Sequence, residues 1–331
     1  DLSFGFQPFH HCRSNLFDDT GAPVWRLNLH KSNAANERLA DGLLYGRKGP
    51  RKETPGQDTP HSNSLGNDTK KDMAGCRAFN RKSIVIERKD PMTNRTLVVS
   101  IDALITADIP VLKQLPNLGR VMEHASWITD IECIYPTLTY PCHATIATGC
   151  WPDRTGINNN EIPDFFAKGR MDWYWWREAI QVPTVVDFAR QAGLTASTVT
   201  WPVMCASGAE YNIGEIWAPR EEDDPTPWFT RANSPAVAKI FEANKHMLRW
   251  MKTPQMDEFA AKCAADIIRA HRPDLMLLHL SYVDHQRHRL GVHGDLEHAF
   301  RFIDGQMGLV LDALEETGGV ENTNIVLQIG R

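Results

Sequence analysis

The chain has 331 residues, of which 42% are hydrophobic and 23% are charged, and its formal net charge at pH 7 is -5. This composition is ordinary for a globular protein with a sizeable core, arranged in one or two domains. The negative charge argues against a binder of nucleic-acid polymers, which needs concentrated Lys and Arg. No run of residues is long and apolar enough to predict a membrane span. The seven cysteines are odd in number and include no C-x-x-C pair, which favours a reduced, cytoplasmic setting.

The first part of the chain, residues 1–91, is rich in polar and turn-forming residues and has few apolar residues at regular spacing. This composition predicts a poorly ordered leader outside the domain, with one short helix at residues 36–45. Met92 directly precedes the first good strand, so one hypothesis makes Met92 the natural start and the leader an appended segment. The alternative is an ordinary disordered tail. Both predict that deleting residues 1–91 leaves the melting temperature nearly unchanged.

From residue 96 onward the pattern alternates between strands and helices. Apolar and β-branched runs predict strands at residues 97–101, 127–134, 195–200, 275–280 and 324–329. Helical spacing and stop signals predict helices at residues 111–124, 143–148, 183–191, 235–251, 255–270 and 295–317. Residues 211–229 are expected to be irregular, with a solvated acidic loop at 221–224. The fold class is therefore α/β, a predominantly parallel sheet with helices on both faces, formed by residues 92–331.

Two further patterns have a structural interpretation. Met256, Phe259, Cys263 and Ile267 recur at helical spacing, which predicts a core stripe rather than a cofactor site. The aromatic cluster at residues 171–176 is, by itself, more typical of packing than of a binding surface.

The stretch YPTLTYPCHATIATG, residues 135–149, carries the first candidate for chemistry. Pro141 suits the first turn of a helix and Gly149 suits its end, which places Thr139 at the helix N-terminus. Backbone N–H groups and the helix dipole there attract a phosphate. The Thr139 hydroxyl could attack phosphorus if a metal lowered its pKa. On this stretch alone, an ordinary helix cap is the more frequent explanation.

Other polar residues follow predicted strands. Asp102 follows the strand at 97–101, and Asp284 follows the strand at 275–280. Ligand sites in α/β sheets gather at the carboxyl ends of strands. Asp284 and His288 are four residues apart, so on a helical turn both side chains could reach one metal. His285 points elsewhere at this spacing.

These residues lie in motifs that resemble the type I phosphodiesterase/nucleotide pyrophosphatase family of the alkaline phosphatase superfamily. The matching motifs are VVSIDAL around Asp102, YPTLTYPCHATIATG around Thr139, GINNN ending at Asn160, TWP at residues 200–202, and D-x-x-x-H at Asp284 and His288. They occur in the family's order over residues 93–331.

The resemblance implies a hydrolase of phosphodiester or pyrophosphate bonds in small, nucleotide-like substrates. It implies two divalent metal ions, zinc by analogy, with Asp102 and Thr139 at one ion and Asp284 and His288 at the other. Thr139 would attack phosphorus and form a phosphothreonine intermediate, and Asn160 would hold a non-bridging phosphate oxygen. A phosphomonoesterase or a phosphonoacetate hydrolase of the same superfamily is the alternative activity.

The sequence departs from the family pattern in three places. Thr155 stands where the family has a His, and Gly330 and Arg331 stand where the family has an Asp and a His that bind metal. A later His is also absent. Two protein ligands for each ion are fewer than tight zinc sites use. These departures favour a truncated or inactive chain with little or no turnover, unless His285 or His293 completes a metal shell.

Overall fold

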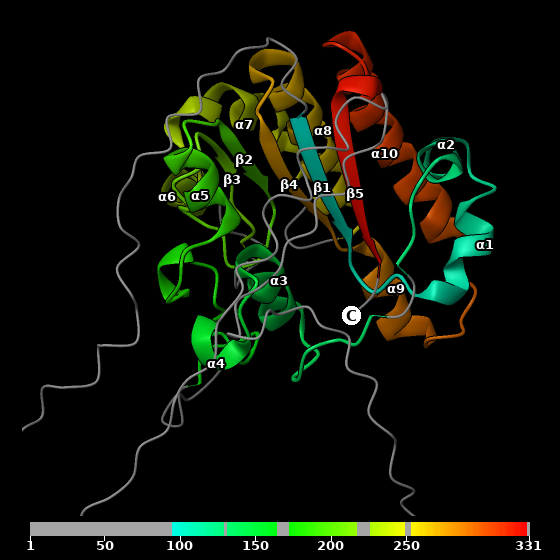
Figure 1. The fold of residues 1–331 in the computed structure, drawn as a ribbon, viewed down its shortest axis with the longest axis horizontal. Helices are drawn as coiled ribbons and strands as arrows, with labels where there is room; N and C mark the ends of the chain where they lie inside the picture. Colours follow the sequence, from blue (N-terminus) through cyan, green and yellow to red (C-terminus); the bar gives the residue numbers. More distant parts are fainter. Residues whose placement is uncertain (1–94, 129–130, 164–171, 217–225, 249–252, 330–331) are drawn as a thin grey trace, which may run out of the picture. The chain divides into compact units, whose positions relative to one another are not determined.

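The computed structural model describes residues 95–128, 131–163, 172–216, 226–248 and 253–329. Within them, five parallel strands form one sheet in the order β3-β2-β4-β1-β5 (Figure 1). The predictions for residues 1–91, for 221–224 and for Gly330 and Arg331 lie outside the described residues. The strands are β1 Arg95–Ile101, β2 Ala196–Val199, β3 Tyr211–Ile213, β4 Leu275–Leu280 and β5 Thr323–Ile329.

Helices connect the strands and pack on both faces of the sheet, which confirms the predicted fold class. Parallel strands need crossover connections. Helices lie in the connections from β1 to β2, from β3 to β4 and from β4 to β5, whereas the connection from β2 to β3, which is described throughout, contains none. The α-helices are α1 Ile109–Leu112, α2 Pro116–Glu123, α3 Thr139–Thr148, α4 Pro152–Thr155, α5 Val185–Gln191, α6 Thr226–Ala232, α7 Ala238–Asn244, α8 Gln255–His271, α9 Tyr282–Leu290 and α10 Glu297–Glu316. None of these helices combines the length and the apolar character that crossing a membrane requires.

The core lies between the sheet and its helices. All six residues of β4 are buried, as expected for a central strand that is covered on both faces. α8 packs against β4 and against α10. Its predicted core stripe is confirmed, because each member is at most 4% exposed: Met256, Phe259, Cys263 and Ile267.

Two local predictions were wrong. Residues 127–128 and 131–134 form no strand, because their apolar side chains do not join the sheet: Ile128 is 75% exposed and Ile131 is 65% exposed. Residues 211–229 are less irregular than expected, since they contain β3 and the start of α6. The helix expected at 295–317 begins two residues later, at Glu297, and the Asp295 carboxylate accepts the Glu297 N–H at 3.1 Å.

The register of the central strands sets the place of the candidate site. Ile101, the last residue of β1, pairs with Leu280, the last residue of β4. The ladder continues one step further, because the Asp102 N–H donates to the Leu280 carbonyl at 2.9 Å. Asp102 and α9, which begins at Tyr282, therefore both start from the carboxyl edge of the sheet.

Candidate active site

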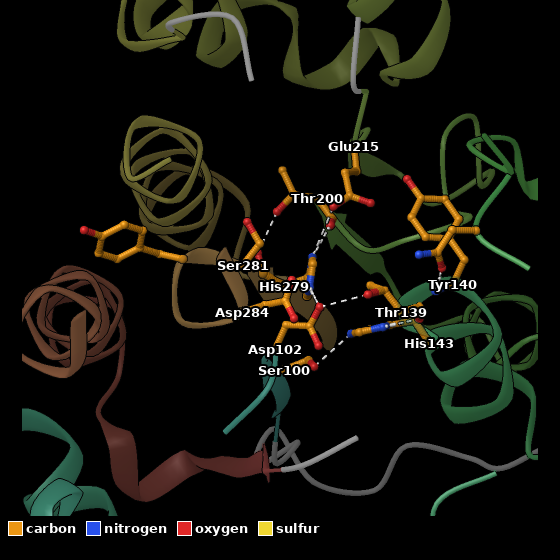
Figure 2. Close-up of polar contacts among 12 residues, drawn as sticks. Ser100, Asp102, Thr139, Tyr140, His143, Thr200, Glu215, His279, Ser281 and Asp284 are labelled. Carbon is orange, nitrogen blue, oxygen red and sulfur yellow. Dashed lines mark hydrogen bonds and ion pairs between the residues drawn. The ribbon is translucent and has the colours of Figure 1, made fainter. Parts of the chain in front are cut away.

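A direct contact joins two of the predicted residues. The Thr139 hydroxyl donates to Asp102 Oδ2 at 3.1 Å (Figure 2). Asp102 is only 5% exposed, and Thr139 is the first residue of α3. The cap residue of α3 is Leu138, with no side-chain cap bond, so Thr139 is not the ordinary cap that its position alone favours. The fold brings a hydroxyl from one segment and a carboxylate from another into one pair.

His143 connects the first turn of α3 to β1. Its Nδ1 lies 2.7 Å from the Thr139 carbonyl oxygen, and its Nε2 lies 2.9 Å from Ser100 Oγ. A carbonyl only accepts, so Nδ1 carries the proton and Nε2 can accept from the Ser100 hydroxyl. This neutral tautomer satisfies both contacts of a ring that is 2% exposed. Figure 2 shows the imidazole between Ser100 and the backbone of Thr139.

Asn160 lies at the same end of α3. Its Oδ1 accepts the Tyr140 N–H at 2.9 Å, which fixes the plane of the amide and leaves the amide nitrogen as its donor. The Tyr140 N–H is used by Asn160, Pro141 has none, and the Cys142 N–H donates to the Leu138 carbonyl at 3.0 Å. Three of the first four residues of the helix thus offer no open backbone N–H to a phosphate. The Asn160 amide nitrogen is therefore a candidate donor to a phosphate at this end of the helix.

A buried histidine lies behind Asp102. His279 of β4 is 2% exposed, and its Nε2 is 3.7 Å from Asp102 Oδ2, which is ion-pair distance. On the other side of the ring, Nδ1 is 3.4 Å from Glu215 Oε1 and 3.1 Å from the Thr200 carbonyl oxygen. Burial lowers the pKa of the imidazole, but the Asp102 and Glu215 carboxylates outweigh burial and raise the pKa to about 10. The ring is thus held between two acids.

Backbone conformation directs Thr200 toward His279. Thr200 follows β2 and has a φ of 49°, in the left-handed region that β-branched residues avoid. Its carbonyl accepts from His279 Nδ1, and its hydroxyl donates to the His279 carbonyl at 2.8 Å. Four polar residues lie at the ends of four neighbouring strands: Glu215 after β3, Thr200 after β2, His279 in β4 and Asp102 after β1. Their order follows the order of these strands in the sheet. One polar row therefore crosses four adjacent strands (Figure 2).

The second pair of predicted residues lies on α9. His288 Nε2 is 3.4 Å from Asp284 Oδ2, which confirms that the two side chains share a face of the helix. The Asp284 side chain is 20% exposed, whereas the His288 side chain is 70% exposed. His285 and His293 are both exposed.

The base of α9 is held by a buried carboxylate of α8. Asp257 is 1% exposed and accepts from the Ser281 N–H at 3.0 Å, the Ser281 hydroxyl at 3.1 Å and the Tyr282 N–H at 2.8 Å. Burial raises the pKa of Asp257 to about 6, against the lowering effect of the hydrogen bonds from Ser281 and Tyr282. Asp257 therefore caps a helix from outside it and sets where α9 leaves the sheet.

The donors suit divalent metals in type but fall short in number. Carboxylate, hydroxyl and imidazole groups are ligands that zinc accepts. Within the ranges described above, however, no group of three or more His, Cys, Asp or Glu side chains gathers as a metal site would need. The contacts described above bring such groups together in pairs, Asp102 with Thr139 and Asp284 with His288. The sequence also predicts that Asp102, Thr139, Asn160, Asp284 and His288 all lie in one cleft at the carboxyl edge of the sheet. The described contacts join Asp102 to Thr139, Asn160 to the first turn of α3, and Asp284 to His288, and the shared cleft stays a prediction.

Sequence reasoning missed four residues of this region: His143, Glu215, Asp257 and His279. A signal existed for His279, since it is the one polar residue in the apolar run LMLLHL. Glu215 likewise lies between Gly214 and Ile216 in a short apolar stretch. Nothing local marked Asp257, whose partners are 24 and 25 positions away in the sequence.

The predicted aromatic cluster lies close to α3. Trp175 is 6% exposed, as packing predicts. The Trp173 ring meets the Tyr140 ring edge-on, with centroids 5.3 Å apart. The Arg231 guanidinium lies 4.0 Å from the centre of the Trp176 ring. The cluster therefore combines core packing with a partly exposed cation–π contact.

Comparison with known proteins gives the class. The family model described as type I phosphodiesterase/nucleotide pyrophosphatase matches residues 96–328. Venom phosphodiesterase 2 of Crotalus adamanteus is 25% identical over 224 residues, covering 64% of this chain and 23% of that protein. Human ectonucleotide pyrophosphatase/phosphodiesterase family member 1 is 24% identical over 230 residues, covering 64% of this chain and 20% of that protein.

Among solved structures, murine ectonucleotide pyrophosphatase/phosphodiesterase 5 aligns with a TM-score of 0.49 at 16% identity, covering 71% of this chain and 56% of that one. Phosphonoacetate hydrolase from Sinorhizobium meliloti aligns with a TM-score of 0.49 at 17% identity, covering 68% and 54%. The family-model match spans most of the chain, so the chain belongs to the type I phosphodiesterase/nucleotide pyrophosphatase family. It spans less than a quarter of the length of the curated relatives it matches.

Proposed function

We propose that this region acts in the hydrolysis of phosphodiester or pyrophosphate bonds in small, nucleotide-like substrates, with Thr139 as the nucleophile. The observation that carries the proposal is the 3.1 Å contact between the Thr139 hydroxyl and Asp102 Oδ2 at the carboxyl edge of the sheet. Membership of a family of phosphodiesterases supports the reaction class.

The proposed reaction uses the described side chains in defined roles. Asp102 Oδ2 accepts the Thr139 proton while Oγ1 attacks phosphorus, and the bond from phosphorus to the leaving oxygen breaks. The phosphoryl group stays on Thr139 with its remaining ester as a phosphothreonine diester. Water then releases the phosphate monoester and restores the hydroxyl. The Asn160 amide nitrogen, oriented by Tyr140, donates to a non-bridging oxygen, an effect typically worth about 3 kcal/mol.

We further propose two divalent metal ions, zinc by analogy with the family. Asp102 and Thr139 would belong to the shell of one, and Asp284 and His288 to the shell of the other. When bound, such ions supply charge stabilisation to the attacking and leaving oxygens. Because each described pair is too small for a complete zinc shell, the remaining ligands must come from other residues, and low turnover of this chain stays a prediction.

The test is hydrolysis of a chromogenic nucleotide phosphodiester with added zinc, compared across three chains. Thr139→Ala should abolish any hydrolysis that the unmodified chain performs. Thr137→Ala, which removes an exposed threonine two residues away, should leave the rate unchanged. Measurable hydrolysis at equal rates in the Thr139→Ala and unmodified chains would contradict the proposed nucleophile. Robust hydrolysis that depends on Thr139 would support it and overturn the expected low turnover. A panel of phosphomonoesters and phosphonoacetate would decide between the alternative activities.

A further inference from the structure

Two cysteines lie against each other beside the nucleophile helix. The sulfur atoms of Cys133 and Cys142 are 3.6 Å apart. Cys142 is on α3, one turn after Thr139, and is 7% exposed. Cys133 is half-buried in the irregular segment that leads into α3. Neither residue has a role in the proposed reaction.

We propose that Cys133 and Cys142 are a modification site that forms an intrachain disulfide by exchange with a small disulfide such as oxidised glutathione. The bond would close a ring of ten residues, since the cysteines are nine positions apart, and the ring would contain Thr139. This inference is independent of the proposed function, because it concerns the thiols alone.

The geometry requires only a small movement. A disulfide has an S–S length of roughly 2.05 Å, so the sulfur atoms must approach by roughly 1.6 Å. Cys142 is held in the helix by the bond from its N–H to the Leu138 carbonyl at 3.0 Å. Cys133 is less restrained, because Ile131 and Tyr135 on either side of it are 65% and 89% exposed. The segment around Cys133 can therefore adjust to the helix.

Exposure also sets the order of the two exchange steps. Cys133, the more accessible thiol, loses its proton and attacks one sulfur of glutathione disulfide, which releases one glutathione thiolate. The Cys142 thiolate then attacks the Cys133 sulfur and displaces the second glutathione. In sum, two protein thiols lose two electrons and two protons, and one glutathione disulfide becomes two thiols.

The other described cysteines lack this arrangement. Cys205 and Cys263 are fully buried, and burial raises the pKa of each thiol well above its usual range. Such thiols are poor nucleophiles. Cys150 is half-buried, and it follows α3 in the same stretch of sequence, which makes it the competitor to exclude.

The sequence offers a clean assay. Trypsin cleaves after Arg120 and Arg154 with no Lys or Arg between them, and this peptide holds Cys133, Cys142 and Cys150. The folded full-length chain is equilibrated with excess oxidised glutathione, denatured, alkylated and digested, and the labels on the peptide are counted by mass spectrometry. We expect three labels before oxidation and one afterward, together with the loss of two hydrogen atoms and no glutathione adduct.

Serine variants assign the bond. Cys150→Ser should show no label after oxidation, whereas Cys133→Ser should keep Cys142 labelled and Cys142→Ser should show a glutathione adduct on Cys133. Oxidation should raise the melting temperature of Cys150→Ser and leave that of Cys133→Ser unchanged. Three labels after oxidation, a stable glutathione adduct on the unmodified chain, or loss of the bond in Cys150→Ser would overturn the proposal.

Discussion

The two pairs of candidate residues are held by the fold in different ways. In the pair of Asp102 and Thr139, Asp102 is buried and Thr139 is half-buried, and His143 and His279 contact the pair from α3 and β4. The pair on α9 is fixed at its base by Asp257, but the His288 side chain is 70% exposed. The first pair is therefore held in place by contacts from α3 and β4, whereas the geometry of the second depends on a helix that is held at its base and on an exposed imidazole.

The largest expected effect is at the base of α9. Asp257→Ala leaves the Ser281 and Tyr282 N–H groups buried without an acceptor, and we expect a loss of about 3 kcal/mol in the free energy of unfolding. Urea denaturation measures this value. Glu258→Ala, which changes the next residue of α8, should cost under about 0.5 kcal/mol. A loss as small as that of the control would show that Asp257 does not hold α9.

A pH series sharpens the same point. Burial raises the pKa of Asp257 from 3.8 to about 6, so its contribution to stability is fully present below pH 3.8 and is lost as the pH rises through about 6. The difference between the two pKa values corresponds to a change of roughly 3 kcal/mol at most in the free energy of unfolding. The free energy of unfolding is measured for the unmodified chain and for Asp257→Asn from about pH 4 to about pH 7. The difference between the two chains gives the contribution of Asp257, because the other carboxylates titrate in both. If the free energy of unfolding changed with pH in the same way in both chains, the raised pKa of Asp257 would be contradicted.

The link from α3 to β1 should give an intermediate effect. His143→Ala removes the contacts to Ser100 and to the Thr139 carbonyl, and we expect a loss of about 2 kcal/mol in unfolding free energy. A double-mutant cycle with Ser100→Ala should give a coupling of about 1 kcal/mol. The same cycle between Ser100 and His271, which stacks on Tyr211, should give a value near zero. Equal coupling in both cycles would exclude a specific Ser100–His143 bond.

The smallest effect is expected at the exposed end of α9. Without metal, His288→Ala should change the unfolding free energy by less than about 0.5 kcal/mol, because exposed ion pairs contribute little. Added zinc should raise the melting temperature of the unmodified chain more than that of His288→Ala, if His288 binds metal. An identical zinc response in Arg289→Ala and His288→Ala would remove His288 from the proposed shell.

The sequence predicted elements where the local pattern and the tertiary environment agree. The apolar run of β4 and the Pro and Gly signals of α3 are examples, and the contact of Thr139 with Asp102 matches the chemistry expected of them. The prediction of a strand at 127–134 was wrong, because an apolar run in the sequence does not show whether the segment pairs with the sheet. The sequence marks His279 and Glu215 as polar residues in apolar stretches. Their alignment with Thr200 and Asp102 in one row could not be predicted, because the row exists only once four strands align.

The central claim is that Thr139 is a preorganised nucleophile, and covalent trapping tests it most directly. The chain is mixed with zinc and a chromogenic nucleotide phosphodiester, quenched in acid and digested, and the peptide of residues 121–154 is sequenced by mass spectrometry. The account predicts a nucleotidyl phosphoryl group on Thr139, absent in Thr139→Ala and retained in Thr137→Ala. No adduct on any residue, or an adduct on a residue other than Thr139, would contradict it.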